Sequence, residues 1–324
     1  MTILHAAPVL PTGPLLILIN AGSGRNDTVA MREIIAGILN RAARAHRIIL
    51  VEDPTTLERI AQDAVAEALA SDGAVVIAGG DGTINTIVNA ALANGCPIGI
   101  LPQGTFNYFA RAHGIPEDIG DATHALLQSY AQPVQVGLVN ERLFVVNASL
   151  GLYPKLLEDR EATTLQYGRS RWVATWAGLL TVLRWKRPMR LIMEGNGVPT
   201  ILKTFTLFVG NNRLQMERLG IPLGAAVEEG RLAAVALRPV ATLGMLWLML
   251  RGAFNRLGDA DKVVSFGFTR MVVKPAHFSR RRRIKVATDG EITWLRTPLE
   301  FRVSPKPLYL LKPLTTILPS VPAV

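Results

Sequence analysis

The stretch "IAGGDGTINTIVNAAL" (77–92) decides the fold, because a glycine-rich turn joins an apolar run to a helix-patterned run. The apolar residues "AVVIA" (74–78) have the length and continuity of a buried strand. After the turn, Ile84 and Val88 begin a spacing that keeps apolar side chains on one face of a helix. A buried strand, a turn and a helix in this order predict a parallel sheet. Asp81 is the one charged residue in the stretch, and it needs its own explanation.

The same alternation fills the first third of the chain. Continuous apolar runs occupy residues 15–19, 47–51 and 97–101, and helical patterns cover 28–44 and 55–70. Buried runs that alternate with amphipathic helices predict a parallel sheet with helices on both faces. Ligands of such sheets bind beyond the carboxyl ends of the strands. We therefore expect the glycine-bearing turns at these ends to converge on one crevice.

The texture changes after about residue 134. Short alternating runs follow, and many are separated by Gly, Pro or Asn turns, which predicts an antiparallel β-rich domain. Two helical stretches, at roughly 169–185 and 240–257, interrupt it. We expect an α/β domain over 1–134, a β-rich domain over 135–304, and a C-terminal tail, 305–324, that can return to the first domain.

The composition limits the class of protein. The chain has 324 residues, is 49% hydrophobic and carries a formal net charge of +10. Its two longest uncharged apolar runs, 172–183 and 239–250, end at arginines and are too short to span a bilayer. No signal peptide is expected at the N-terminus. The single cysteine, Cys96, excludes an internal disulfide, suits the cytosol and reads as a small buried apolar residue.

The positive charge favours an anionic partner, which could be nucleic acid, an anionic membrane or a phosphorylated ligand. Trp172, Trp176 and Trp185 lie among basic residues, as suits the headgroup zone of a bilayer, although such tryptophans also pack in cores. Four arginines, Arg280–Arg283, form a run that decorates a solvated loop or attracts an anionic membrane. On the second reading, changing Arg280–Arg283 to serine lowers binding to anionic vesicles.

The glycine turns have a specific chemical use. A strand that runs through glycines into a helix presents backbone N–H groups that attract phosphate oxygens. The chain contains neither the P-loop lysine motif nor a G-x-G-x-x-G after a strand. A carboxylate such as Asp81 beside phosphates requires a cation such as Mg²⁺. The alternative is an ordinary turn in which Asp81 caps the helix. Two further turns after strands, "NAGSGR" (20–25) and "GTFN" (104–107), favour the phosphate reading.

Five segments carry a family resemblance, in family order and with similar spacing. They are "NAGSG" (20–24), "GGDGTIN" (79–85), "LPQGTFNYFARAHGIP" (101–116), "EEGRL" (228–232) and "DGE" (289–291). With these segments the chain resembles the diacylglycerol kinase catalytic-domain family, in its bacterial soluble lipid-kinase branch, which is related to the sphingosine kinases. The resemblance covers nearly the whole chain.

The resemblance implies a fold of two domains. The first is a parallel-sheet domain, like those of NAD kinase and phosphofructokinase, that binds ATP and Mg²⁺. The second is an antiparallel β-sandwich that holds a lipid. The implied function is transfer of phosphate to the hydroxyl of diacylglycerol or a related lipid. We expect a cytoplasmic protein, peripheral on the inner face of an anionic membrane and without a nucleic-acid partner. The sequence leaves open whether the chain forms a homodimer.

The resemblance also implies roles for individual residues. Asp81, Asp289 and Glu291 are the expected catalytic residues, and Asp81 also the ligand of the catalytic Mg²⁺. Glu228 and Glu229 correspond to a stretch that holds a structural Mg²⁺ in some members. The positions that match the nucleotide-binding motifs are Asn20, Gly22, Ser23, Gly24, Gly79, Gly80, Asp81, Gly82, Thr83, Asn85, Gly104, Thr105 and Asn107.

The residues of "DGE" agree with this assignment, although without the resemblance a solvated turn would be the favoured interpretation. A lipid alcohol needs a base to take its proton, and a carboxylate within hydrogen-bond reach serves. The alternative is a solvated hairpin turn, because Asp-Gly is a frequent hairpin signal. Which of Asp289 and Glu291 is the base stays open, with a preference for Glu291.

Several positions depart from the family pattern. Ala21 replaces a proline, and Tyr108 replaces the aspartate of the third turn. Glu52 and Asp53 stand where the family often has a nucleotide-contacting threonine.

Two other functions therefore stay open. One is a soluble small-molecule kinase of the NAD kinase type, which shares the glycine-aspartate turn. The other is a non-catalytic lipid-binding regulatory protein, against which the intact Asp81, Asp289 and Glu291 argue.

Overall fold

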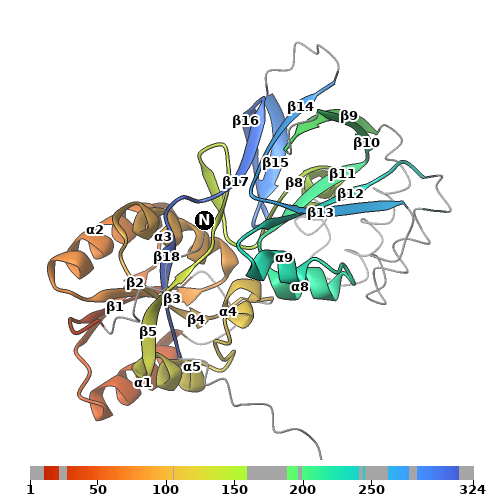
Figure 1. Ribbon diagram of the computed structural model, residues 1–324. Helices are drawn as coiled ribbons and strands as arrows, with labels where there is room; N and C mark the ends of the chain where they lie inside the picture. The colour runs from red at the N-terminus through yellow and green to blue at the C-terminus, as the bar shows by residue number, and fades with distance from the viewer. Residues whose placement is uncertain are drawn as a thin grey trace, which may run out of the picture. The chain divides into compact units, whose positions relative to one another are not determined.

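A computed structural model describes most of the chain, in two compact units. One unit joins Met1–Val134 to Lys306–Val324, and the other is Gln135–Pro305 (Figure 1). The helical stretches expected at 169–185 and 240–257 lie outside the described residues, apart from residues 240 and 244. The described residues are 11–21, 28–104, 106–158, 188–195, 199–240, 244, 262–276 and 283–313.

The first unit is built on one six-stranded sheet with the order β2-β1-β3-β4-β18-β5. Its first five strands in this order run parallel, and β5 pairs antiparallel with β18. Most of the sheet is therefore parallel, as the alternation of runs predicts. The strands are β1 (Leu15–Asn20), β2 (His46–Val51), β3 (Ala74–Gly79), β4 (Ile98–Pro102), β5 (Ser129–Val134) and β18 (Leu308–Pro313).

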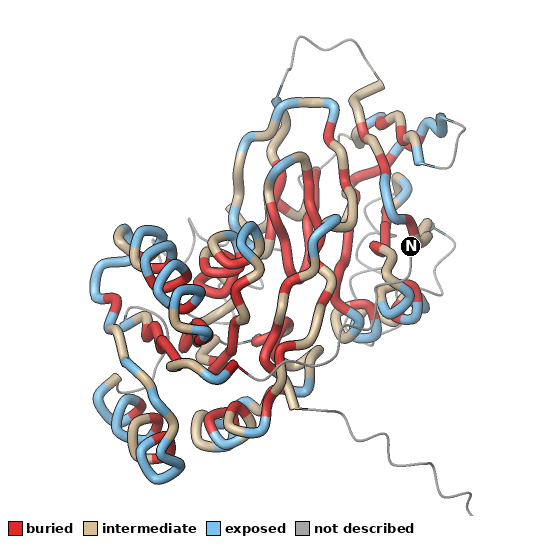
Figure 2. The backbone as a smooth tube through the Cα atoms, turned by 60° about the vertical axis from the view of Figure 1, so that its left-hand side comes forward, coloured by how far each residue is buried: buried red, intermediate tan, exposed pale blue. Residues whose placement is uncertain are grey.

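The central strands of this sheet are buried on both faces. Every residue of β3 is buried, and β1 is buried from Leu15 to Ile19. Strands covered on both faces need continuous apolar runs instead of alternation. The edge strand β2 is more exposed along its length. Figure 2 shows that the buried residues gather on the strands and on one side of the helices.

Helices follow the strands of the first unit and end where the sequence signals them. Helix α3 stops at Gly95, which takes the left-handed φ of 71° that ends many helices. Helix α5 starts after Asp118, whose side chain accepts the Asp121 N–H. The helices are α1 (Thr28–Arg41), the short 3₁₀ helix η1 (Pro54–Thr56), α2 (Leu57–Ala70), α3 (Asp81–Asn94), α4 (Tyr108–Ala112) and α5 (Ile119–Leu127).

The second unit contains two antiparallel six-stranded sheets, with the orders β10-β9-β14-β17-β6-β7 and β13-β12-β11-β8-β15-β16. Side chains of both sheets, such as Phe144, Leu207 and Phe301, form one buried cluster, as expected of a sandwich. The strands are β6 (Gly137–Val139), β7 (Arg142–Phe144), β8 (Asn147–Gly151), β9 (Met189–Glu194), β10 (Thr200–Thr204), β11 (Thr206–Gly210), β12 (Leu232–Leu237), β13 (Val263–Phe268), β14 (Arg270–Pro275), β15 (Arg283–Thr288), β16 (Glu291–Arg296) and β17 (Leu299–Val303).

The predicted fold class, an α/β sheet followed by an antiparallel β-sandwich, is confirmed. The sequence analysis did not anticipate the short helices α4 and α5, nor α8 (Arg213–Arg218) and α9 (Gly224–Glu228) in the second unit. Met216 of α8 packs with Ala233 of β12 in a small buried cluster. Such short helices are stabilised by packing, which a local pattern does not report.

Candidate active site

The first three glycine-bearing turns leave neighbouring strands of one sheet. Strands β1, β3 and β4 lie side by side and parallel, so their carboxyl ends share one edge. The turn after β3 is tied to the one after β4, because the Gln103 N–H donates to the Gly79 carbonyl over 3.0 Å. The end of β1 is tied to α3, because the Asn20 amide donates to the Thr83 hydroxyl over 3.0 Å. Gly22, Ser23 and Gly24 lie outside the described residues.

Glycine allows two of these turns to approach one another at backbone distance. A Cβ atom on Gly104 would lie 3.2 Å from the Gly80 Cα and 2.8 Å from the Asn107 Oδ1. A Cβ atom on Gly79 would lie 2.7 Å from the Thr83 Cβ. Side chains at these positions would force the backbone apart. The N–H groups around Gly80 and Gly104 are thus held close together, in the way that favours anion binding.

The turn after β4 is held by Asn107. This residue is buried, has a left-handed φ of 47°, and accepts the Gly104 N–H over 2.8 Å. Next to it, the Phe106 and Tyr108 rings stack with centroids 5.7 Å apart. Tyr108, which stands in place of the family's aspartate, thus joins an aromatic pair and begins α4. Thr105 lies outside the described residues.

Asp81 does not cap its own helix. The N-cap of α3 is Gly80, which makes no side-chain bond, and the Asp81 carboxylate instead accepts the N–H groups of Phe109 and Tyr108. Burial raises the pKa of Asp81, and these two hydrogen bonds oppose the rise. Its Oδ1 is buried and has no hydrogen-bond partner among the residues that the structure describes. The reading of Asp81 as a helix cap is therefore wrong.

The surroundings of Asp81 fit a bound cation. A buried carboxylate oxygen without a hydrogen-bond donor is costly unless something positive reaches it. Oxygen ligands of this kind suit Mg²⁺, which is bound through one or two carboxylates together with phosphate oxygens and water. Among the described residues there is no cluster of three or more His, Cys, Asp or Glu side chains able to hold a metal. The ligand set around Asp81 would thus depend on the nucleotide.

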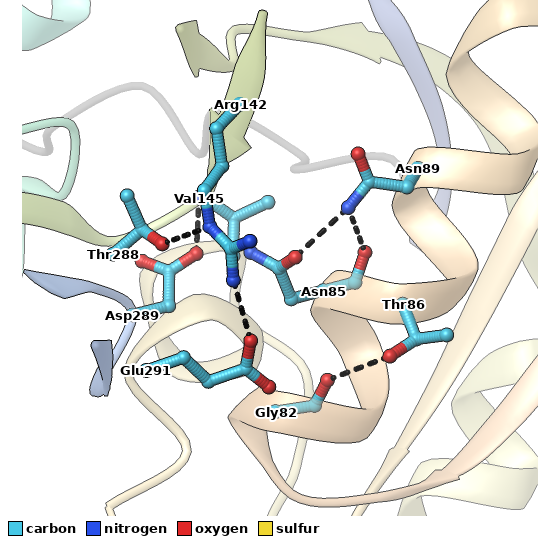
Figure 3. Close-up of polar contacts among 9 residues, drawn as sticks. All are labelled: Gly82, Asn85, Thr86, Asn89, Arg142, Val145, Thr288, Asp289 and Glu291. Atoms are coloured by element: carbon cyan, nitrogen blue, oxygen red, sulfur yellow. Dashed lines mark hydrogen bonds and ion pairs between the residues drawn. The ribbon is translucent and has the colours of Figure 1, made fainter. Parts of the chain in front are cut away.

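Two asparagines and a threonine complete the first turns of α3. The Asn89 amide donates to both the backbone and the side-chain oxygen of Asn85 over 2.9 Å, which orients the buried Asn85 side chain. The Thr86 hydroxyl donates to the Gly82 carbonyl over 3.4 Å. Figure 3 draws these contacts.

At the end of β2, where the family often has a nucleotide-contacting threonine, this chain has Glu52 and Asp53. Asp53 caps the short helix η1, and its carboxylate accepts both the N–H and the hydroxyl of Thr55. These bonds lower the pKa of Asp53. Asp53 is thus a local capping residue beside the end of β2.

In the second unit, Asp289 and Gly290 of "DGE" form the two-residue turn of the β15–β16 hairpin, and Glu291 begins β16. Asp289 and Gly290 have φ values of 48° and 92°, the left-handed pair that closes tight hairpins. The Asp289 carboxylate turns back to the chain between β7 and β8. It accepts the Val145 N–H over 2.7 Å (Figure 3). It also accepts the N–H groups of Val146 and Asn147 over 2.8 and 2.9 Å. Asp289 thereby fixes the backbone on which the hairpin rests.

Glu291, the other carboxylate of the motif, is more exposed and is held by Arg142. The Arg142 guanidinium donates to the Glu291 Oε2 over 2.7 Å and to the Thr288 hydroxyl over 2.8 Å (Figure 3). The sequence analysis missed both partners. Thr288 directly precedes the motif, but no local signal distinguishes Arg142, which reaches the turn from another sheet of the same unit.

The glutamates expected to hold a structural Mg²⁺ are paired with arginines. Glu228 forms an ion pair with Arg213, and Glu229 forms one with Arg231. The hydrogen bonds that Arg213 donates to Glu217 and Glu228 raise the pKa of Arg213. A cation at this turn would have to displace guanidinium groups. A structural Mg²⁺ at this turn therefore stays a prediction.

The remaining expectations concern Cys96, membrane-spanning helices, and the tryptophans and arginines that could meet a membrane. Cys96 is buried as expected, and burial raises its pKa to about 11. Within the described ranges, no helix is long and apolar enough to cross a membrane. Trp172, Trp176, Trp185 and Arg280–Arg282 fall outside these ranges.

The fold and these turns define a class: an α/β unit with glycine turns at neighbouring strand ends, and a β-sandwich unit with an acidic hairpin turn. Residues 14–139 match the family described as "Diacylglycerol kinase catalytic domain". This match confirms the resemblance that the motifs indicated.

Curated relatives point the same way. The chain is 35% identical over 146 residues to the diacylglycerol kinase of Bacillus subtilis, a match that covers 44% of this chain and 47% of that one. The aligned part thus spans about half the length of this relative. A candidate lipid kinase of Staphylococcus haemolyticus is 28% identical over 253 residues, covering 73% of this chain and 75% of its own. These relatives support a kinase.

Solved structures share the fold. Two crystal structures of diacylglycerol kinases or candidate diacylglycerol kinases from Bacillus anthracis align with TM-scores of 0.68 and 0.71. Each alignment covers 93% of this chain and 97% of the other, at 17% and 18% sequence identity. At this identity the likeness speaks for the fold alone.

Proposed function

We propose that this chain is an ATP- and Mg²⁺-dependent lipid kinase that phosphorylates a hydroxyl group of diacylglycerol or a related lipid at a membrane surface. One observation carries the proposal: the Asp81 carboxylate has a buried oxygen, with no hydrogen-bond partner among the described residues, beside two glycine turns that approach at backbone distance. The names of the relatives, diacylglycerol kinase and lipid kinase, support the substrate class.

The first unit supplies the nucleotide half of the reaction. Backbone N–H groups in the turns after β1, β3 and β4 bind the phosphate oxygens of ATP, and Gly80 and Gly104 leave room for them. Mg²⁺, when bound, neutralises charge that develops on the transferring phosphate. Asp81 holds this ion, while Asn20 and Asn107 keep the flanking turns in place.

The second unit supplies the base. Glu291 takes the proton of the lipid hydroxyl as its oxygen forms a bond to the γ-phosphorus. The bond between that phosphorus and the bridging oxygen breaks, and ADP leaves. Arg142 holds the Glu291 carboxylate in one orientation. Asp289 is a positioning residue, because its oxygens already accept three backbone N–H groups.

The test uses the purified full chain with radiolabelled ATP, Mg²⁺ and a panel of lipids in detergent micelles, followed by extraction into organic solvent. We expect label in the organic phase with diacylglycerol or a related lipid, and only when Mg²⁺ is present. D81A should lose at least about 10²-fold in rate, the order expected when an electrostatic stabiliser of the transition state is removed.

Three outcomes would contradict the proposal. Label transferred to NAD and to no lipid would favour the small-molecule kinase. Tight lipid binding without any transfer would favour the non-catalytic reading. Full turnover by D81A would refute the role of Asp81.

A further inference from the structure

One face of the β15–β16 hairpin gathers basic side chains around a tryptophan. Arg283 pairs with Arg296 across the two strands, and Lys285 pairs with Trp294. Residues two apart on a strand point to the same face, so these four side chains share one face of the hairpin. We call Arg283, Lys285, Trp294 and Arg296 the hairpin face. Strand β16 is the edge strand of its sheet (Figure 1).

Trp294 is unusually exposed for a tryptophan, with 56% of its surface accessible. The Lys285 ammonium lies 5.2 Å from its ring centroid, within the range of a cation–π contact. Lys285 also forms an ion pair with Glu158, so its charge is largely satisfied within the unit. The indole is therefore held at the surface instead of being folded into the core.

The two arginines have no acidic partner within the described part of the chain. Arg283 and Arg296 are exposed, and neither forms an ion pair with any residue that the structure describes. Like charges directly opposite on paired strands destabilise a sheet. Charges on an edge strand do discourage strand-to-strand aggregation, which would account for the arginines alone. It would not account for an exposed indole between them.

We propose that the hairpin face docks on an anionic lipid bilayer. Arginines attract anionic headgroups, and tryptophan is suited to the interface because its ring is apolar and its N–H is polar. The combination fits a membrane surface better than nucleic acid, since only one aromatic ring is exposed here and stacking on bases uses several. This inference names the surface through which the proposed lipid kinase reaches its substrate, but docking itself does not require catalysis.

The experiment measures co-sedimentation of the full chain with vesicles of phosphatidylglycerol and phosphatidylcholine, and with vesicles of phosphatidylcholine alone, without ATP. We expect binding to the anionic vesicles that weakens as salt is raised. R283Q/R296Q should weaken it about 25-fold, taking about five-fold for each basic residue near an anionic surface. W294S should weaken it several-fold while salt still reduces what remains.

Matched controls separate the face from general charge and apolarity. R32Q/R59Q removes two exposed arginines from helices of the other unit. I201S removes an apolar side chain of the same unit that is 69% exposed on β10. Both controls should bind as the unchanged protein does. All variants should keep their melting temperature, because the substituted side chains are exposed.

Equal vesicle binding by W294S, R283Q/R296Q and the unchanged chain would overturn the inference. The inference would also be overturned if W294S or R283Q/R296Q changed the molar mass of the protein in light scattering while vesicle binding stayed intact. The hairpin face would then contact a second copy of the chain. Phosphoryl transfer to lipid in detergent micelles, measured in parallel, keeps the two proposals separate. A kinase whose hairpin-face variants bind vesicles normally refutes docking alone, and docking without transfer refutes the kinase alone.

Discussion

Asp81 and Asp289 both accept backbone N–H groups, but they differ in what they have left to offer. Asp289 receives three such bonds, and both of its oxygens are engaged. Asp81 receives two from α4 and keeps one buried oxygen for which the described residues offer no donor. The first arrangement fixes a turn, and the second leaves a negative charge in need of a positive partner.

Asp289 and Glu291, the two acids of the hairpin turn, should have opposite phenotypes when they are replaced. D289N should lower the free energy of unfolding by about 1.5–3 kcal/mol, the value of a hydrogen bond to a charged group. E291Q should leave stability nearly unchanged, since exposed ion pairs contribute about 0–1 kcal/mol, but lower kcat by about 10²–10⁴-fold. Urea unfolding and steady-state kinetics measure both. A stable, inactive D289N beside an active E291Q would reverse the assignment.

Without bound nucleotide and Mg²⁺, the Asp81 carboxylate should lower the stability of the folded protein at neutral pH. Because burial raises its pKa in the fold, its contribution to stability is complete below the ordinary value of 3.8 and is lost as pH rises through the folded pKa. At neutral pH, D81N should therefore melt about 2–4 °C higher for each kcal/mol recovered. ATP with Mg²⁺ should raise the melting temperature of the unchanged chain but not of D81N. Equal ligand shifts in both proteins would argue against a bound cation at Asp81.

At the scale of single residues, the sequence was sufficient to predict which residues belong to the candidate site but not which side chains contact them. The charged residue in a glycine turn was informative because few roles suit Asp81 there. Arg142, by contrast, carries no local signal: its contact with Glu291 exists only because two sheets pack together. Side-chain partners brought together by tertiary packing are beyond what a single sequence encodes locally.

At the scale of elements, the close approach of two turns makes one glycine critical. G104A would place a methyl group 3.2 Å from the Gly80 Cα, a backbone atom that cannot move aside easily. We expect G104A to raise the KM for ATP or to abolish turnover. The matched control is G37A in α1, where the new Cβ would meet only the Arg41 side chain at 3.7 Å.

Since alanine is favoured over glycine inside helices by about 0.5–1 kcal/mol, G37A should be slightly more stable and fully active. Differential scanning calorimetry and ATP-dependence of the rate test the pair. If G104A turned over as G37A does, backbone proximity of the two turns would have no role in nucleotide binding.

The long elements were predictable for a physical reason. Strands β3 and β4, and β1 up to Ile19, are apolar because both faces are buried. Helix α2 keeps Ala61, Ala64 and Val65 on its inner face. Boundaries agreed within a few residues. Helices α4 and α8 have only one or two turns, so hardly any periodicity exists to detect. Their positions depend on neighbours such as Asp81 and Ala233.

At the scale of the whole molecule, His113 contributes to the loss of stability at acid pH. Burial, with a smaller effect from the Lys312 charge, lowers the pKa of His113 to about 3. The folded state thus holds a neutral His113, while the unfolded chain binds a proton near the ordinary 6.5. Its contribution is present above pH 6.5 and is lost progressively as pH falls toward 3.

H113Q should flatten the decline of unfolding free energy between about pH 6.5 and 4, relative to the unchanged chain. Urea titrations at a series of pH values measure this slope. H124Q, which changes an exposed histidine of α5 with no such burial, should leave it as it was. Identical slopes in H113Q and the unchanged protein would place the acid sensitivity elsewhere.

The last described strand, β18, has a consequence for how this chain is made. Residues 308–313 lie between β4 and β5, so the first sheet lacks an inner member until the entire second unit has been synthesised. During translation two strand edges would stay open, a state prone to mispairing. A ribosome-bound intermediate should therefore fold its sandwich early and the first unit last, so that the proposed phosphate-binding turns form only after residues 308–313 have left the ribosome.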